Sequence, residues 1–524
     1  MENTNVPIIP ESMAKVLAAT SISQSLSFCL ERKYLEKIDD ANLNPYFSLT
    51  EVISTSKNDV SWLEITQVGK PLEESVENCF TAMQKILYSC FMPKETQLLF
   101  LITGSEKQNR LYLGVRPMST SIKKNITKYL SEFMKGVWPG LQCHIIKDES
   151  GDEGLQSFSS LIRKDSLEYV YALTGIPSME SQYKSTYPAT IDKLMAGMNQ
   201  RHYAYLVVAD PIETNEIDAM LFQCREMNWQ AESMKSFNVT EGRSQGSSCS
   251  HTITDGTSTS EGTSTSKKDY SKLGKLALQG TGIALAASFF PAAQSVLEGA
   301  TEIGGQLVAG AVSMMGVGAA RSLVGSLTPS KTISSTTGTN HSESDSTSTN
   351  EGQSQSLSRN IVNKHIESVS EHLFYHSKRL ETGKAIGMWK VGTYLLASKE
   401  SDIKGGAMQL RSILSGQESI FEPIRITDIS NVIETEQSIG RFQSPIVRVD
   451  STSNNKPFNH PLGDHYKELK TVLTTKELSY LINFPLRSVP GISVIDSSPE
   501  FSLNMQEKKD DKTIGIGKLL YGGS

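Results

Sequence analysis

The middle of the chain consists of three consecutive segments of different composition. Any fold of the flanking sequence has to accommodate them. Two tracts rich in Ser, Thr and Gly, residues 243–266 and 331–358, flank a charge-poor block rich in Ala and Gly, residues 276–327. Both tracts alternate small hydroxyl residues with other residues. Two matching arms around an apolar tip predict one long insert, residues 241–358, that leaves the body, turns and returns.

Two interpretations of the arms stay open. Tracts rich in Ser, Thr and Gly are typical of linkers and disorder. However, alternating Thr and Ser also favour β-structure, and an arm such as 243–266, if extended, would reach roughly 80 Å. A lone polar hairpin would be unstable, but the same hairpin repeated around a ring could close into a polar barrel without free edges. Strand pairing within an oligomer and plain disorder are therefore equal alternatives.

The tip contains two stretches without charged residues, 276–297 and 303–320. Each is close to the ~20 residues that a membrane helix needs, and their Gly and Ala spacings would let helices approach closely. Several glutamines and one proline make them weakly apolar for a membrane span. Helix packing in an oligomer and membrane contact are therefore equally favoured. The residues predicted to make either contact are Phe289, Phe290, Gly304, Gly305, Ala309, Gly310, Met314, Met315 and Val317.

Composition narrows the class of protein. A chain of 524 residues should hold more than one domain. Its net charge of −6 argues against a surface dominated by phosphate contacts, so nucleic acid is expected only as a partner of a whole assembly. The six cysteines contain no C-x-x-C pair, which favours reduced thiols, and the N-terminus does not read as a signal peptide. We expect a cytoplasmic protein, with membrane association left open by the tip.

The expected fold class is α+β, with several domains. Residues 98–115 read as a β-hairpin, followed by a helical stripe at 119–137 and a strand at 141–146. These elements predict a small N-terminal α+β domain, residues 1–164.

The insert interrupts a second unit. Residues 165–240 and 359–430 read as two halves of a split α/β domain, and the halves should share one sheet because each alone is too small. Residues 431–524 read as shorter strands with one helix at 475–481. The whole is expected to be small mixed sheets with helices, interrupted by the hairpin-like insert and its helical tip.

No catalytic motif is recognised in this chain. A phosphate-binding loop needs G-x-x-x-x-G-K-[ST], and the nearest approaches, 382–384 and 514–518, lack both the hydroxyl and the spacing. His365, His372 and His376 share one predicted helix. His372 and His376, four residues apart, share a face and could bind a metal, but without H-E-x-x-H the favoured interpretation is exposed helix histidines. We therefore predict no enzymatic activity for this chain alone, no catalytic residue, no cofactor and no metal.

Six stretches carry a resemblance to a known family: 174–178, 191–198, 203–211, 387–397, 473–481 and 484–491. They resemble the region that precedes the motor in ATPases of the HerA/FtsK superfamily, which includes conjugative and type IV secretion ATPases. The resemblance implies an accessory part of a hexameric machine that translocates DNA or protein. In such proteins a Gly-rich strand like 514–524 leads into the motor, so a motor domain after Ser524 or a separate motor subunit is expected as partner.

These observations favour a non-catalytic assembly or scaffold module of a ring-forming, ATP-driven translocase, acting in defence or secretion. Copies of the chain would associate through the insert, in a ring of six by the resemblance. The alternative is a membrane-inserting or pore-like protein that acts through the hairpin 276–327.

Overall fold

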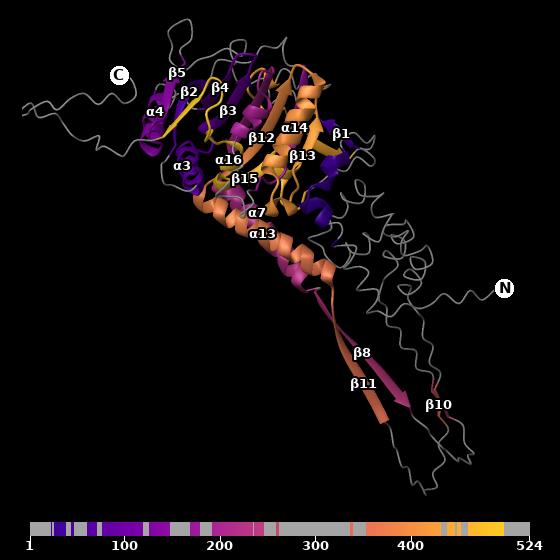
Figure 1. Ribbon diagram of the computed structural model, residues 1–524. Coiled ribbons are helices and arrows are strands. Elements are labelled where there is room, and N and C mark those ends of the chain that lie inside the picture. Colours follow the sequence, from indigo (N-terminus) through magenta and orange to yellow (C-terminus); the bar gives the residue numbers. More distant parts are fainter. Residues whose placement is uncertain are drawn as a thin grey trace, which may run out of the picture.

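The computed structural model describes residues 23, 26–37, 43–46, 60–70, 76–118, 125–146, 168–178, 191–233, 235–245, 258–260, 336–338, 353–430, 438–445, 448–451 and 460–496. They form a mixed α+β body, and a pair of long helices leads from this body to a two-stranded ribbon (Figure 1).

The core of the body is one ten-stranded sheet. Its strands follow the order β13 (Arg425–Asp428), β6 (Tyr169–Thr174), β12 (Met388–Ala397), β7 (Tyr203–Pro211), β3 (Thr96–Gly104), β4 (Asn109–Pro117), β2 (Ser61–Lys70) and β16 (Ser493–Asp496). β15 (Thr471–Thr474) also pairs with β12, and β5 (Gln142–Ile145) with β2. Neighbouring strands run antiparallel, except that β16 pairs with β2 in parallel. A short pair, β1 (Leu43–Tyr46) with β14 (Arg448–Ser451), lies apart from this sheet.

Helices and loops cover both faces of the sheet, which explains why its central strands are nearly continuous apolar runs. One face packs against α3 (Val76–Ser89), α4 (Ile126–Val137), α6 (Asp192–Gly197), α14 (Glu400–Leu414) and α16 (Thr475–Leu481). The other packs against α7 (Thr214–Ser233), α13 (Lys364–Ile386) and segments around residues 26–35, 439–442 and 462–472.

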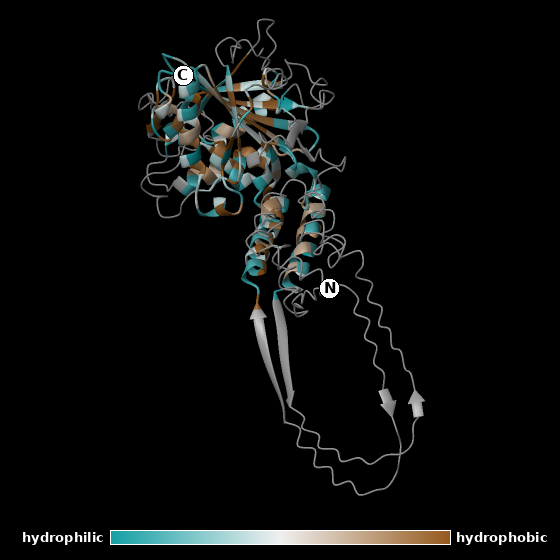
Figure 2. Ribbon diagram, turned by 90° about the vertical axis from the view of Figure 1, so that its right-hand side faces the viewer, coloured by the Kyte–Doolittle hydropathy of each residue, from teal (hydrophilic) through white to brown (hydrophobic). Residues whose placement is uncertain are grey.

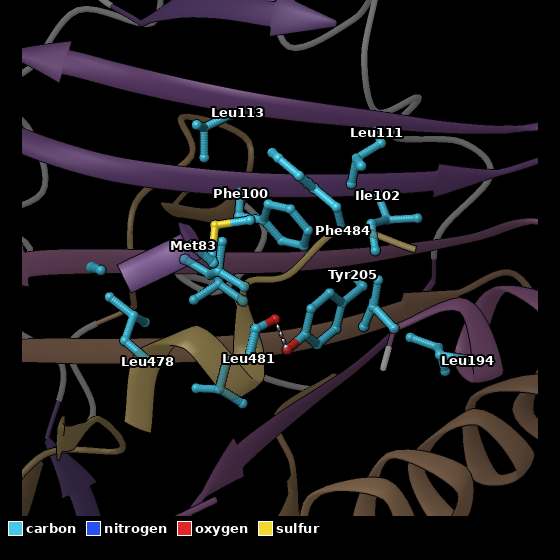
Figure 3. Packing of buried hydrophobic residues seen from close by; sticks show 14 of the residues in the cluster. Met83, Phe100, Ile102, Leu111, Leu113, Leu194, Tyr205, Leu478, Leu481 and Phe484 are labelled. Carbon is cyan, nitrogen blue, oxygen red and sulfur yellow. Dashed lines mark hydrogen bonds between the residues drawn. The ribbon is translucent and has the colours of Figure 1, made fainter. Parts of the chain in front are cut away.

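Figure 3 shows the first of these two cores, where Phe100 and Tyr205 of adjacent strands lie beside Leu481 of α16. The Tyr205 hydroxyl donates a hydrogen bond of 3.2 Å to the backbone oxygen of Leu481. The Tyr205 hydroxyl is thus satisfied inside the apolar layer, as a buried hydroxyl group requires.

Several expectations from the sequence are confirmed. The predicted hairpin is β3 and β4, and the two halves on either side of the insert share one sheet, because β12 lies between β6 and β7. The expectation of small mixed sheets is wrong. Strands from the first 150 residues join those of the split unit in one sheet, since β3 pairs with the free edge of β7. The proposed domain boundaries themselves stay a prediction.

The start of α16 gives a first testable prediction. Thr474 caps this helix, its hydroxyl accepts from the Glu477 amide, and the Glu477 carboxylate accepts from the Thr474 amide. Replacing Thr474 by alanine should lower the free energy of unfolding by about 1 kcal/mol, because one amide then loses its acceptor. Urea unfolding of both proteins measures the difference, and equal midpoints would contradict it.

Candidate functional site

The predicted contact residues of the tip, between Phe289 and Val317, lie outside the residues that the structure describes. What it does describe is the base of the insert. Within the described ranges, no helix is long and apolar enough to cross a membrane. The same ranges contain no group of three or more His, Cys, Asp or Glu side chains placed to hold a metal ion.

The insert leaves the body on two antiparallel helices, α7 and α13, which together are called the stalk (Figure 2). Small polar side chains join them along their length. Cys224 donates from Sγ to the backbone oxygen of Leu373 at 3.1 Å and receives a hydrogen bond of 3.3 Å from Ser377. Ser370 donates to Asn228 at 2.8 Å. Such close polar contacts hold the two helices in one fixed register.

Ion pairs border the solvent side of the stalk. Arg225 pairs with Glu381 and Lys384 with Asp218, each at 2.6 Å. Lys384 belongs to the 382–384 stretch that resembles part of a phosphate loop in sequence. In the structure this stretch lies inside α13, so its backbone amides are used in the helix. An ion pair between exposed side chains contributes little stability, but these two mark where the outer edges of the helices meet.

The stalk continues into an antiparallel pair of strands, β8 (Ser236–Gln245) and β11 (Gln353–Val362), called the ribbon. Asn363 makes the junction: its amide donates to the Lys235 backbone oxygen at 2.9 Å and its side chain caps α13. The ribbon register runs from Ser236 opposite Val362 to Gln245 opposite Gln353. The two chain segments therefore leave the body together and remain paired.

Short pieces of the two arms pair again farther along the chain. β9 (Ser258–Ser260) and β10 (Thr336–Gly338) form a second antiparallel pair. These positions fall inside the predicted arms 243–266 and 331–358. Where the structure describes the arms, they are thus paired strands, and the remainder of the arms lies outside the described residues.

Three aromatic side chains on the stalk were not singled out from the sequence. Phe222 and Trp229 of α7 and Phe374 of α13 are 70%, 69% and 65% exposed. The spacing of seven between Phe222 and Trp229 places them on one helix face, which was a readable signal. What the sequence did not give was the direction of that face, because it depends on how the stalk packs against the sheet.

The expectation of exposed helix histidines is wrong for His376. His365 is exposed and His372 is half-buried, but His376 is fully buried. Its Nδ1 lies 3.3 Å from Nη1 of Arg379. Burial, together with this guanidinium, holds the pKa of His376 well below its ordinary value. α13 packs against β15 and α16, which cover the face of this helix that carries His376.

Polar side chains from four adjacent strands lie side by side on the sheet face that packs against α7 and α13. Register places Arg116 of β4 opposite Gln97 of β3, and Asp210 of β7 opposite Lys390 of β12. Arg116 donates to Gln97, and Gln97 donates to Asp210 at 2.5 Å. The Arg116 guanidinium also donates to the backbone oxygens of residues 441 and 442. The row thus ties the sheet to the loop that lies over it.

Two further residues complete this network. Lys470 lies 3.6 Å from Asp210 and 3.5 Å from Glu468, and Lys390 lies 2.9 Å from Glu468. Burial and the neighbouring Lys470 lower the pKa of Lys390. Burial alone would lower the pKa of Lys470 too, but Asp210 and Glu468 raise it. Each carboxylate is paired with a lysine, the arrangement of a structural network that fixes the segment before β15.

Two buried ion pairs anchor other segments on this face. Arg32 and Glu422 lie 2.8 Å apart, and Arg32 also donates to the backbone oxygens of Tyr466 and Glu468. This joins the N-terminal segment to two loops that come much later in the chain. Arg379 of α13 and Glu477 of α16 form a second, two-pronged pair, with distances of 2.6 and 2.8 Å.

Five of the six cysteines, Cys29, Cys79, Cys90, Cys143 and Cys224, are described, and all five are buried free thiols. Burial raises the pKa of Cys90 to about 12 and that of Cys29 likewise. A thiol that stays protonated is a poor nucleophile. Cys29 and Cys90 therefore behave as small core side chains.

Comparison with known proteins gave no match to a protein-family model, to a curated protein or to a solved structure.

Proposed function

We propose that this chain is a non-catalytic assembly module, and that copies of it associate through the projecting insert. The observation that supports this most directly is the ribbon. Ten residues of β8 pair with ten of β11, and among the described residues neither strand has a neighbour on its outer edge. An isolated two-stranded sheet is marginal in water, and open edges invite pairing with another chain.

The stalk supports the same function because it makes the ribbon a rigid projection. Two helices of 20 and 23 residues carry the ribbon away from the body, joined by the contacts of Cys224 and Ser370. Helices of this length extend roughly 30 Å, at about 1.5 Å per residue. A rigid projection presents its strand edges at a fixed distance from the body, which suits a repeated contact between copies.

The larger machine is proposed from the resemblance to the HerA/FtsK superfamily. In this proposal six copies form a ring, a motor domain or motor subunit hydrolyses ATP, and DNA or protein is the translocated substrate. The chain described here would supply assembly and positioning.

Two deletions separate the parts of the insert. Gln245 and Gln353 are opposite each other at the end of the ribbon, so an Asn-Gly turn between them would close β8 and β11 into a hairpin without residues 246–352. Lys235 and Asn363 are joined by a backbone hydrogen bond, so a short Gly linker there would remove the ribbon as well. Both variants should keep a folded body, which thermal unfolding would verify.

We expect mass photometry to find the full chain as a ring and the variant without ribbon as a monomer. The hairpin variant should associate more weakly than the full chain, because it keeps the strand edges but loses the arms. If the full chain is a monomer at every concentration, or if the variant without ribbon still forms the ring, the proposal is wrong. Flotation of the full chain with liposomes, without self-association, would favour the membrane-inserting alternative.

A further inference from the structure

Resting on the proposed function, we infer that the outer face of the stalk is a second contact between copies of this chain. The face, called the aromatic face, is formed by Phe222, Trp229 and Phe374. The proposed function assigns assembly to the insert beyond the stalk. The inference adds a separate surface on the helices themselves, with a second copy as its partner.

The three aromatic side chains share one surface. Phe222 and Trp229 are two turns apart on α7, roughly 10 Å along one stripe. Phe374 is likewise two turns before Glu381 on α13, and Glu381 pairs with Arg225, which lies between the two α7 aromatics. The contacts of Ser370 with Asn228 and of Ser377 with Cys224 place Phe374 beside the same part of α7.

This surface points away from the core of the body. The buried residues of α7, including Ile217, Cys224 and Met227, belong to the cluster that contains the sheet residues Leu206 and Val208. The stripe of Phe222 and Trp229 lies on the other side of the same helix, which is why both remain about two-thirds exposed. Single exposed apolar residues are ordinary, but three large aromatics grouped on two packed helices form a patch of the kind that marks a contact surface.

The size of the patch suits a contribution to a protein interface. An aromatic side chain buries about 150–250 Å², so three of them two-thirds exposed offer about 400 Å² per copy. Each partner in a standard interface buries about 800 Å². The aromatic face therefore supplies roughly half of one side, and it needs a further contact such as the ribbon edge to complete a stable interface.

Charge and position favour a second copy as the partner. The charged side chains bordering the face include two closed pairs, Asp218 with Lys384 and Arg225 with Glu381. Glu226, Glu371 and Lys378 lie beside them, so the face has no excess positive charge that would attract nucleic acid or an anionic membrane. The stalk also runs directly into the ribbon through Lys235 and Asn363. A copy that pairs with the ribbon edge would bring its own stalk alongside, and its aromatic face could then be covered.

Trp229 is a built-in reporter for this contact. The chain has four tryptophans, and Trp62, Trp138 and Trp389 are at most 3% exposed. Subtracting the emission of a Trp229→Phe variant from that of the full chain isolates the signal of Trp229. On association we expect this signal to shift to shorter wavelength and its quenching by acrylamide to fall several-fold, in step with ring formation measured by mass photometry at the same concentrations.

A double variant, Phe222→Ser with Phe374→Ser, tests the energy of the contact. Because central aromatic residues dominate interfaces, the concentration for half-assembly should rise roughly tenfold to a hundredfold. Met408→Ser is the matched control, since Met408 is 72% exposed on α14, a helix on the opposite face of the sheet. The control should assemble as the full chain does, and thermal unfolding should be unchanged in both variants.

The outcomes separate this inference from the proposed function. If the chain assembles while Trp229 stays as accessible to acrylamide as in the monomer, the aromatic face is not an interface and the ribbon alone carries assembly. The inference also fails if Trp229 is shielded at every concentration, which would mean cover from the same chain, or only when vesicles are added. If the full chain never assembles, both fail.

Discussion

Replacing Arg379 by methionine should lower the free energy of unfolding by about 3–5 kcal/mol, the usual cost of leaving one buried charge without its partner. Arg379 and Glu477 are 5% and 7% exposed and form a two-pronged pair. Arg379 also donates to the backbone oxygen of Val472 at 2.8 Å. The substitution therefore leaves the buried Glu477 carboxylate without its guanidinium partner. The Val472 carbonyl, at the junction of α13, β15 and α16, also loses a hydrogen-bond donor. Urea unfolding followed by circular dichroism would measure the loss.

A second substitution tests whether the stability loss comes from the unpaired buried charge or from lost packing. Adding Glu477→Gln to the Arg379→Met variant removes the stranded charge and should recover part of the lost stability, because glutamine can still accept from the Thr474 amide. Lys404→Met, which breaks the exposed pair of Lys404 with Glu400 on α14, is the control and should leave the unfolding midpoint unchanged. A double variant less stable than Arg379→Met would show that the carboxylate charge is not what destabilises it.

Acid should weaken this protein well above the pH at which its carboxylates titrate. Burial is the main cause that lowers the pKa of His460 to about 3, and burial with Arg379 holds that of His376 well below 6.5. Above pH 6.5 both histidines are neutral in the folded and unfolded states, so the full stability is present. Below pH 6.5 these two histidines become protonated in the unfolded chain but stay neutral in the folded chain, so the free energy of unfolding falls.

Each histidine then costs about 1.4 kcal/mol for every pH unit below 6.5. For the two together we expect a loss of about 3 kcal/mol between pH 6.5 and 5, somewhat less than this limiting slope gives, because the unfolded histidines are only half protonated at pH 6.5. Urea unfolding in steps of half a pH unit would show the loss. In a His460→Gln variant the unfolding free energy should change less steeply with pH. The difference in slope should correspond to about one proton, whatever the stability of the variant at pH 7. His460 donates to the Cys29 backbone oxygen and accepts from the Leu462 amide, so this variant also loses stability at every pH. An unchanged slope would contradict the assignment.

Local periodicity was enough to place most elements of the sheet. The apolar run 203–208 predicted a strand covered on both faces, and β7 has β12 and β3 as neighbours with helices above and below. The stripe at 119–137 predicted a helix that is described as Ile126–Val137. These predictions succeed because burial of one face makes apolar residues recur with a period of 2.0 in strands and 3.6 in helices, and this spacing is visible in the sequence.

Only part of the candidate site could be predicted from the sequence. Matching composition in residues 243–266 and 331–358 predicted two arms that leave and return together, and where the structure describes the arms they are paired strands. The aromatic face was missed. Phe222 and Trp229 share a helix face by spacing, but Phe374 lies about 150 residues later, and only the packing of α7 on α13 brings the three together.

What the sequence by itself determined is therefore which residues lie on a common strand or helix face, and which long segment is inserted between two halves of one sheet. Only the tertiary structure decided which neighbour covers each face. His376 is buried because α13 packs against β15 and α16. The row from Arg116 to Lys390 exists because four strands share one register. The physical reason is that a period along the chain fixes the direction of a side chain relative to its own element, whereas its burial depends on residues brought near by loops of any length.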